Sequence, residues 1–317
     1  MPLLTDTQNS QLEVLLIRYG FILLPFLFLF ISGCTVEDQS DSSDFDQNRD
    51  SEENEGNTSS EEDSQMEPET DRKVIAKNLS APWEIAKKED ALYISERTGS
   101  IVAIQGEEQV RKPVQFDETL AEQPEAGLLG IAFSSEAGTA YAYYSYQQGG
   151  ANYQRIVTIE ETEDSWKETS ILLDKIPGGT YHHGGRIEIG PDSKLYITIG
   201  DASEPEQAQE LDSLSGKILR MNPDGSIPAD NPFEESYVYT YGHRNPQGLA
   251  WDQNGELYVR KFDAADKTVD LIVSDVGRVR DVLAADGGVY IITNNTDGRG
   301  NPGKEDDQLL FIPIPEN

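Results

Sequence analysis

Tyr181-His182-His183-Gly184-Gly185-Arg186 leads into Ile187-Glu188-Ile189, the turn Gly190-Pro191-Asp192, and the run Leu195-Tyr196-Ile197-Thr198-Ile199, which ends at Gly200-Asp201. The alternation before the turn and the β-rich run after it predict two short antiparallel strands. His182 then lies just before the first strand and Asp201 just after the second. We expect both side chains at the same end of this hairpin, where a carboxylate can orient an imidazole for proton transfer.

Histidine is scarce in this chain, with three copies in 317 residues. Two of them lie in the opening stretch, so imidazole chemistry near neutral pH has few other places to occur. The spacing alone also fits a stable hairpin whose ends happen to be polar. A catalytic pair and this structural alternative both stay open at this point.

Short β-rich segments recur along the chain, and most are followed by a turn and a second apolar strand. Examples are Ala91–Ser95, Ala140–Tyr146, Leu195–Ile199, Glu256–Val259 and Gly288–Ile292. No long run has the 3.6-residue period of a helix. A repeated "strand, turn, strand" unit in an all-β chain predicts a β-propeller of four-stranded blades. A β-sandwich is the structural alternative.

Several motifs occur in a fixed order: His182-x-x-Gly185-Arg186, Gly190-Pro191-Asp192, Gly200-Asp201, Gly216–Gly225, Ile227–Phe233 and Tyr241–Ala250. Together they resemble the signature series of the soluble quinoprotein glucose and aldose sugar dehydrogenases, over roughly Ala81 to Asp252. Several motifs in register are far more specific than one short pattern. The resemblance implies a six-bladed propeller that uses pyrroloquinoline quinone (PQQ) and calcium to oxidise a sugar.

The resemblance also implies roles for individual residues. His182 matches the general base, Asp201 its carboxylate partner, and Arg244 an arginine that points into the active site. Calcium would polarise the quinone as a Lewis acid. His243, beside Arg244, is interpreted as a packing residue.

Other residues match the family's cofactor contacts. Arg278 and Arg280 lie in an arginine-x-arginine-aspartate motif that matches the cofactor-clamping arginines. The remaining candidates are Glu125, which precedes a Gly-Leu-Leu-Gly strand, one of two glutamines in a polar loop, and an asparagine after Arg244 (Gln207, Gln209 and Asn245).

The chain departs from the family pattern after Val259. The loop whose main-chain oxygens help to hold calcium in the family is not found, and no metal ligands can be named. The next residues, Arg260 to Asp263, look like the outer part of a later blade, so we expect about a blade and a half of the family pattern to be absent. Because an open ring leaves strand edges unpaired, we expect a shortened ring of about five blades, or a member whose function is damaged.

The N-terminal region predicts export. Residues 1–34 contain Arg18, an apolar core from Phe21 to Ile31, and the only cysteine, Cys34, after small residues. This order is typical of a secretory signal and resembles a bacterial lipoprotein signal, in which the cysteine is lipidated; an uncleaved anchor is the alternative. Residues 35–72 predict an acidic, disordered linker. Residues 73–317 are long enough for the propeller domain.

The charge of the chain limits its partners. The net charge is −33, of which −13 falls in residues 35–72. This excess argues against nucleic acid or an anionic membrane surface as a partner, so membrane contact is expected only through the lipidated N-terminus. The expected partners are a sugar substrate and an electron acceptor. Two further functions stay open: a non-catalytic lipoprotein that binds carbohydrate or protein, and a metal-dependent lactone hydrolase.

Overall fold

The computed structural model describes residues 72–135, 138–251, 254–261 and 276–314, all within one compact unit, Ser64–Asn317. The predicted signal sequence, Cys34 and almost all of the linker lie outside the described residues. Their boundaries, and the start of the propeller domain at residue 73, therefore stay predictions. Among the residues described, no helix is long and apolar enough to cross a membrane.

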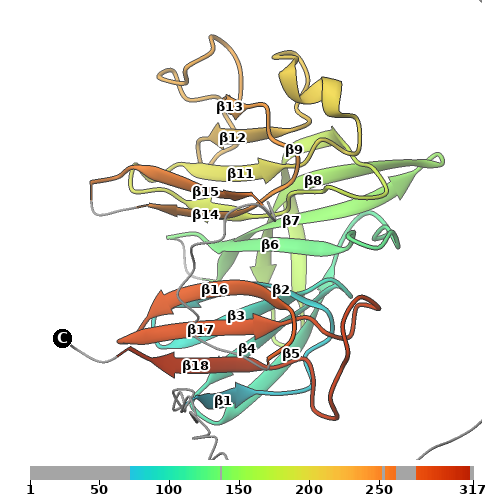
Figure 1. Cartoon of the computed structure of the whole chain (residues 1–317). Coiled ribbons are helices and arrows are strands. Elements are labelled where there is room, and N and C mark those ends of the chain that lie inside the picture. The colour runs from blue at the N-terminus through green and yellow to red at the C-terminus, as the bar shows by residue number, and fades with distance from the viewer. Residues whose placement is uncertain (1–71, 136–137, 252–253, 262–275, 315–317) are drawn as a thin grey trace, which may run out of the picture. The chain divides into compact units, whose positions relative to one another are not determined.

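The described residues form an all-β structure in which neighbouring strands pair antiparallel, apart from one short parallel pairing that joins the outer strands of the first two blades (Figure 1). The first blade contains β2 (Pro82–Lys88), β3 (Ala91–Glu96), β4 (Ser100–Gln105) and β5 (Glu108–Gln115). The second blade contains β6 (Leu128–Phe133), β7 (Thr139–Gln148), β8 (Ala151–Glu161) and β9 (Trp166–Pro177). The third blade contains β10 (Ile187–Ile189), β11 (Leu195–Ile199), β12 (Lys217–Met221) and β13 (Val238–Tyr241).

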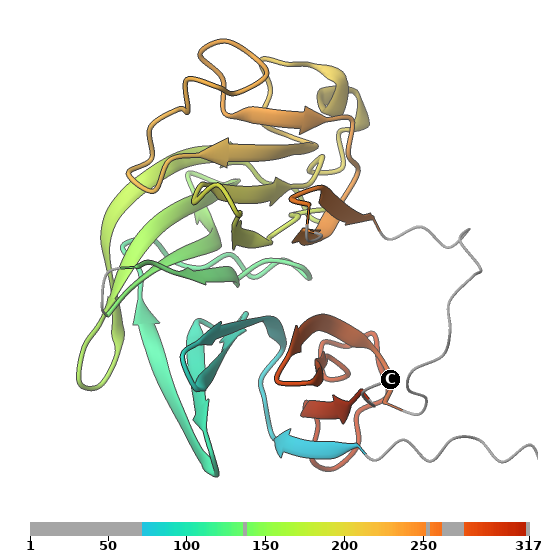
Figure 2. The same ribbon diagram turned by 90° about the vertical axis from the view of Figure 1, so that its left-hand side faces the viewer.

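Two further sheets follow. A half blade contains β14 (Pro246–Trp251) and β15 (Leu257–Lys261). The last blade contains β16 (Val279–Ala285), β17 (Gly288–Thr293), β18 (Leu309–Pro313) and, beside β18, the N-terminal strand β1 (Lys73–Ala76). Figure 2 shows the blue β1 beside the red β18. The first and last strands of the described chain thus share one sheet, which leaves no exposed edge on β18.

The sheets confirm the predicted all-β propeller, with four complete blades and one half blade among the described residues. One assignment was wrong. Arg260 and Lys261 extend β15, and Lys261 lies opposite Pro246 on β14. They belong to the inner hairpin of the half blade and not to the outer part of a later blade, because the β-rich run from Leu257 continues through them. Phe262 and Asp263 lie outside the described residues.

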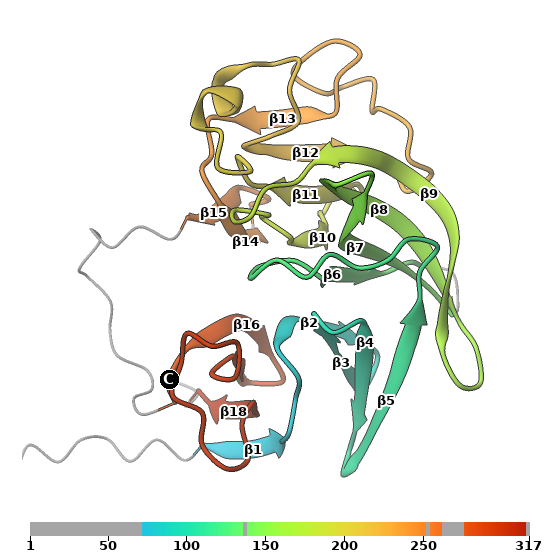
Figure 3. The ribbon, with the colours of Figure 1, turned by 90° about the vertical axis from the view of Figure 1, so that its right-hand side faces the viewer.

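The hairpin of the opening stretch forms as predicted. Ile187 pairs with Ile197 and Ile189 with Leu195, and every residue of β11 is buried. Aliphatic and aromatic side chains from β7, β8 and β12 pack against it between the second and third blades. In Figure 3, β10 lies beside β6 of the second blade. This packing fixes both ends of the hairpin, including the one that carries His182 and Asp201.

The first strands of three blades also carry a buried charged network, which we call the central network. It contains Arg186 and three carboxylates, those of Glu84 on β2, Glu188 on β10 and Asp281 on β16. Arg186 Nη1 lies 3.2 Å from Glu84 Oε1 and 2.9 Å from Asp281 Oδ2, and its Nε donates to the Gln247 carbonyl over 3.1 Å. Burial raises the pKa of each carboxyl, that of Glu188 to about 7.

Candidate active site

His182 and Asp201 form a direct pair at one end of the hairpin. His182 Nδ1 lies 2.7 Å from Asp201 Oδ1, and the Asp201 side chain is buried while that of His182 is 17% exposed. The backbone amide of Ser203 donates to the same Asp201 oxygen over 2.8 Å. Because an ionised carboxylate only accepts, Nδ1 carries the proton and the lone pair lies on Nε2. The pair therefore holds the tautomer that a general base requires.

The loop before β10 is held in an unusual backbone conformation. His182 has a φ of 63°, and Gly184 and Gly185 follow with φ values of 70° and 97°. A Cβ at Gly184 would come within 2.3 Å of the Thr198 carbonyl oxygen, so only glycine fits there. Asn245 supports the loop, because its Oδ1 accepts the Gly184 amide over 3.0 Å.

Glu125 joins this loop to a different blade. Its Oε2 accepts the backbone amide of His182 over 2.9 Å, and its Oε1 lies 2.9 Å from Arg299 Nη1. Burial works to raise the pKa of this carboxyl, but the His182 amide and Arg299 outweigh it and the pKa is lowered. Glu125 is therefore ionised at neutral pH, beside the loop that carries His182.

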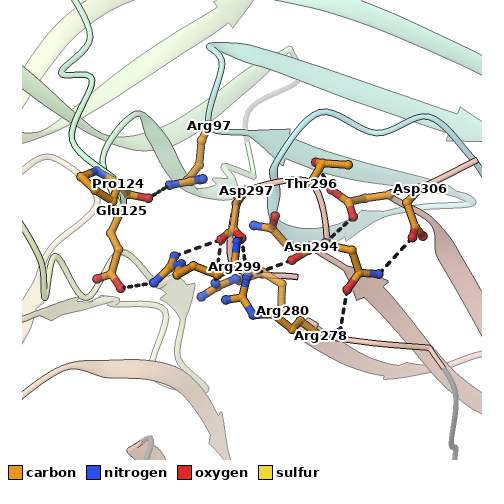
Figure 4. A network of polar contacts seen from close by, with 12 residues as sticks. Arg97, Pro124, Glu125, Arg278, Arg280, Asn294, Thr296, Asp297, Arg299 and Asp306 are labelled. Atoms are coloured by element: carbon orange, nitrogen blue, oxygen red, sulfur yellow. Dashed lines mark hydrogen bonds and ion pairs between the residues drawn. The ribbon is translucent and has the colours of Figure 1, made fainter. Parts of the chain in front are cut away.

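Four arginines gather beside this loop, and we call them the arginine cluster: Arg97, Arg278, Arg280 and Arg299 (Figure 4). Asp297 lies among them with a fully buried side chain. It pairs with Arg278 and with Arg299 Nη2, the latter at 3.0 Å, while Arg280 Nη2 is 4.0 Å away. Arg280 also stacks over the ring of the buried Trp83, 4.5 Å from its centroid.

The arginine cluster carries more positive charge than its neighbouring carboxylates neutralise. Among the residues that the structure describes, four guanidinium groups face two carboxylates, those of Asp297 and Glu125. Burial and the neighbouring arginines lower the pKa of Arg280 to about 10, and the pKa of Arg97 is lowered as well, chiefly by burial. Within the described residues, the buried Nε atoms of Arg97 and Arg280 have no hydrogen-bond partner. Such a site fits an anion with more than one carboxylate.

The remaining predicted residues lie close to the same end. Arg244 is exposed, and its carbonyl accepts the Asp201 amide over 2.8 Å. Gln207 and Gln209 are exposed on a 3-10 helix, Pro205–Gln209, whose Ala208 carbonyl accepts the Gly242 amide over 2.8 Å. Their side chains are thus near the loop that carries Arg244.

His243 behaves as a packing residue. It is 7% exposed, and its Nε2 lies 2.7 Å from the hydroxyl of Thr240. This contact agrees with the interpretation of His243 from the sequence.

Sequence reasoning missed three residues of the site: Arg97, Asp297 and Arg299. Arg97 follows β3, and the other two follow β17, so all three come after the second strand of a blade. Asp201 holds the same position after β11. Comparing blade positions would have placed these residues beside it.

Comparison with known proteins agrees with this geometry. Residues 79–266 match the sequence profile of the glucose/sorbosone dehydrogenase family. The chain belongs to this family. It is 34% identical over 241 residues to quinoprotein glucose dehydrogenase B from Acinetobacter calcoaceticus, and this match covers 64% of the chain and 50% of the relative.

Two further comparisons give similar results. Aldose sugar dehydrogenase YliI from Escherichia coli is 27% identical over 193 residues, covering 56% of the chain and 52% of the relative. The chain thus spans about half the length of these curated relatives. The PQQ-bound aldose sugar dehydrogenase from Streptomyces coelicolor superposes with a TM-score of 0.67 at 27% identity, covering 76% of this chain and 97% of that one.

The arrangement fits PQQ better than it fits calcium. Arg280, with its buried unpartnered Nε, and the surplus charge of the cluster suit the carboxylates of PQQ. By contrast, no group of three or more His, Cys, Asp or Glu side chains in the described ranges is arranged to hold a metal ion. Asp297 and Glu125 are already paired with arginines. The described side chains therefore offer no cluster of ligands for calcium.

Proposed function

We propose that this protein is a PQQ-dependent dehydrogenase that oxidises a hydroxyl group of a sugar. The observation that carries the proposal is the His182–Asp201 pair at 2.7 Å, joined through Glu125 to a cluster of four arginines. A base with a fixed tautomer and a nearby site for a polycarboxylate are the two parts that such a reaction requires. Membership of the glucose/sorbosone dehydrogenase family supports the same assignment.

Oxidation of an alcohol to a carbonyl removes a proton from oxygen and a hydride from carbon. His182 accepts the hydroxyl proton at Nε2, and the buried Asp201 carboxylate stabilises the imidazolium that forms. Arg244, exposed beside this pair, stabilises negative charge that develops on oxygen. Arg278 and Arg280 would hold the cofactor's carboxylates, with Gln207, Gln209 and Asn245 as further candidates for contact. When bound, PQQ supplies the two-electron acceptor for the hydride.

We further propose that the protein acts outside the cytoplasmic membrane, anchored by a lipid on Cys34. The support is the order of Arg18, the apolar core and the single cysteine in residues 1–34. Residues 35–72 would then act as a tether between the lipid and the propeller. A soluble or membrane-bound electron acceptor would reoxidise the cofactor.

A titration of the purified full chain with PQQ tests the proposal. Quinone absorbance is followed during binding, with and without calcium chloride, and then during addition of glucose and other aldoses. We expect saturable binding and sugar-dependent bleaching of the quinone. Failure of a folded protein to bind PQQ under either condition would favour the non-catalytic carbohydrate-binding or protein-binding propeller.

The base is tested with two histidine variants. We expect His182→Gln to bind PQQ with an unchanged Kd and to reduce it at least about 100-fold more slowly, because general-base catalysis contributes factors of this size. His243→Gln is the matched control, since His243 is a buried histidine bonded to Thr240. Reduction at the wild-type rate by His182→Gln would show that another group takes the proton.

A further inference from the structure

Glu125 holds two parts of the site together with its two carboxylate oxygens. Oε2 accepts the backbone amide of His182, and Oε1 pairs with Arg299. Arg299 pairs in turn with Asp297, the buried carboxylate that also binds Arg278. A continuous line of charge-assisted contacts therefore runs from the arginine cluster through Glu125 to the backbone of the candidate base, and Figure 4 shows the part from Arg278 to Glu125.

The backbone conformation of His182 makes its imidazole sensitive to this line of contacts. A non-glycine residue with a φ of 63° is in a sparsely populated conformation that costs roughly 1–2 kcal/mol. The Glu125 carboxylate satisfies the amide of this strained residue, while the side chain of the same residue binds Asp201. A shift of the Glu125 carboxylate therefore reaches the imidazole within one residue, His182, from its backbone amide to its side chain.

Arg299 is suited to sense an anion. Its side chain is 38% exposed, whereas Glu125 is 11% exposed and Asp297 is fully buried. Among the described residues, Arg299 is the arginine of the cluster that contacts both carboxylates. An anion that binds the cluster competes with Glu125 and Asp297 for this guanidinium, so occupancy alters the Arg299–Glu125 contact.

We propose that Glu125 and Arg299 are positioning residues that couple occupancy of the arginine cluster to the placement of His182. Their role in catalysis rests on the proposed function, but the coupling itself does not. Occupancy of the cluster changes the contact that holds the His182 backbone, and this response is lost when either member of the pair is replaced. Neither residue touches the reacting atoms.

The scarcity of histidine makes the coupling measurable by NMR. With isotope-labelled histidine, the full chain gives three imidazole signals, which His182→Gln and His243→Gln assign. The probe is citrate, a tricarboxylate without an aromatic ring that would shift nearby signals. We expect citrate to bind wild-type protein, measured by calorimetry, and to shift the His182 signal saturably while leaving that of His243 in place.

Two variants break the line in different ways. Glu125→Gln keeps the size of the side chain but cannot satisfy both partners as an acceptor, and Arg299→Met removes the cation. In each we expect citrate still to bind through the other arginines, with a several-fold smaller shift of His182. Lys112→Met is the matched control, because Lys112 and Glu161 also form an ion pair between two blades, at 2.9 Å. It should respond like wild type.

The outcomes separate this proposal from the proposed function. An equal His182 shift in wild type, Glu125→Gln and Arg299→Met contradicts the coupling, as does a wild-type His182 signal that citrate leaves unmoved. In the PQQ-loaded enzyme, both variants should lower kcat several-fold at saturating PQQ and change the KM for sugar little. A protein whose His182 signal responds to citrate through Glu125 and Arg299, but which never reduces PQQ, would refute the proposed dehydrogenase function. The coupling itself would stand.

Discussion

Arg186 and Arg280 show two opposite ways of burying a guanidinium in one propeller. Arg186, in the central network, faces three carboxylates, and its pKa is raised despite burial. Arg280, in the arginine cluster, faces three other arginines, and its pKa is lowered to about 10. The two networks come within one residue of each other on β16, at Arg280 and Asp281, where a bulge interrupts the pairing with β17.

The contrast separates a structural charge network from a ligand site. Burying a charge is costly unless it is paired. The central network supplies its own compensation, with Arg186 held by Glu84, Asp281 and the Gln247 carbonyl. Within the described ranges, the carboxylates of the arginine cluster leave two of its positive charges uncompensated, and a bound anion would balance them. Both arginines are buried, so burial alone does not distinguish the two regions. They differ in the sign of the charge that surrounds each arginine.

The largest effect is expected from removing the cation of the central network. Arg186→Met leaves the carboxylates of Glu84 and Asp281 buried without their partner, and we expect a loss of about 3–5 kcal/mol in the free energy of unfolding. Arg280→Met removes a cation from among like charges and should change it by less than about 1 kcal/mol. Urea unfolding at pH 7 measures both, and equal losses would abolish the distinction.

The second prediction concerns the pH dependence of stability. Burial raises the pKa of Glu188 from 4.5 to about 7, so the folded state binds its proton more tightly than the unfolded chain does. This contribution is complete below pH 4.5 and is lost as the pH rises through 7, with a maximum of about 3 kcal/mol. Glu188→Gln should remove this slope. Unfolding free energies at pH 5 and pH 8 test it, and a variant with the wild-type slope would contradict it.

The fold and the pairing of His182 with Asp201 were predictable because their signals are local. His182 and Asp201 flank a single hairpin whose alternation and turn fix both strand ends. The propeller followed from strands that repeat the same short pattern. These features depend on neighbours within about twenty residues, where sequence patterns are strong.

The rest of the site was not predictable because its partners are far apart in sequence. Arg299 and Glu125 are separated by 174 residues and meet only because the last blade lies near the first two. Asp297 and Arg299 occur in a polar loop that resembles any exposed turn. The calcium expectation came only from resemblance, and the described residues contain no cluster of His, Cys, Asp or Glu side chains that would hold the ion. The sequence signal that could have located Asp297 and Arg299 is their position within the repeated blade.

The third prediction concerns the ligand. Arg280→Met should raise the Kd for PQQ about 10- to 100-fold, because a charge-assisted hydrogen bond contributes about 1.5–3 kcal/mol. The folded state should be retained, since like-charge repulsion is relieved. Absorbance titration gives the Kd, with Lys112→Met as a control for loss of an inter-blade cation. An unchanged Kd for PQQ in Arg280→Met would show that the arginine cluster is not part of a PQQ site.

The smallest effect is expected at Asp297 in the arginine cluster. Its contribution to stability should change with pH in the opposite direction to that of Glu188 in the central network. Arg278 and Arg299 outweigh burial and lower the pKa of Asp297 from 3.8 to about 2. Its contribution is complete above pH 3.8 and is lost as the pH falls through 2, the reverse of Glu188. Because its arginine partners are about one-third exposed, solvent screening reduces the contribution to about 1–2 kcal/mol.

Asp297→Asn should therefore lower the free energy of unfolding by about 1–2 kcal/mol at pH 6 and have a much smaller effect near pH 2.5. Urea unfolding across this range measures the difference from wild type. Citrate, which would supply the missing negative charge to Arg278 and Arg299, should recover part of the loss at pH 6. A loss that does not change with pH or citrate would mean that Asp297 acts through packing, and that the cluster's charge balance does not depend on it.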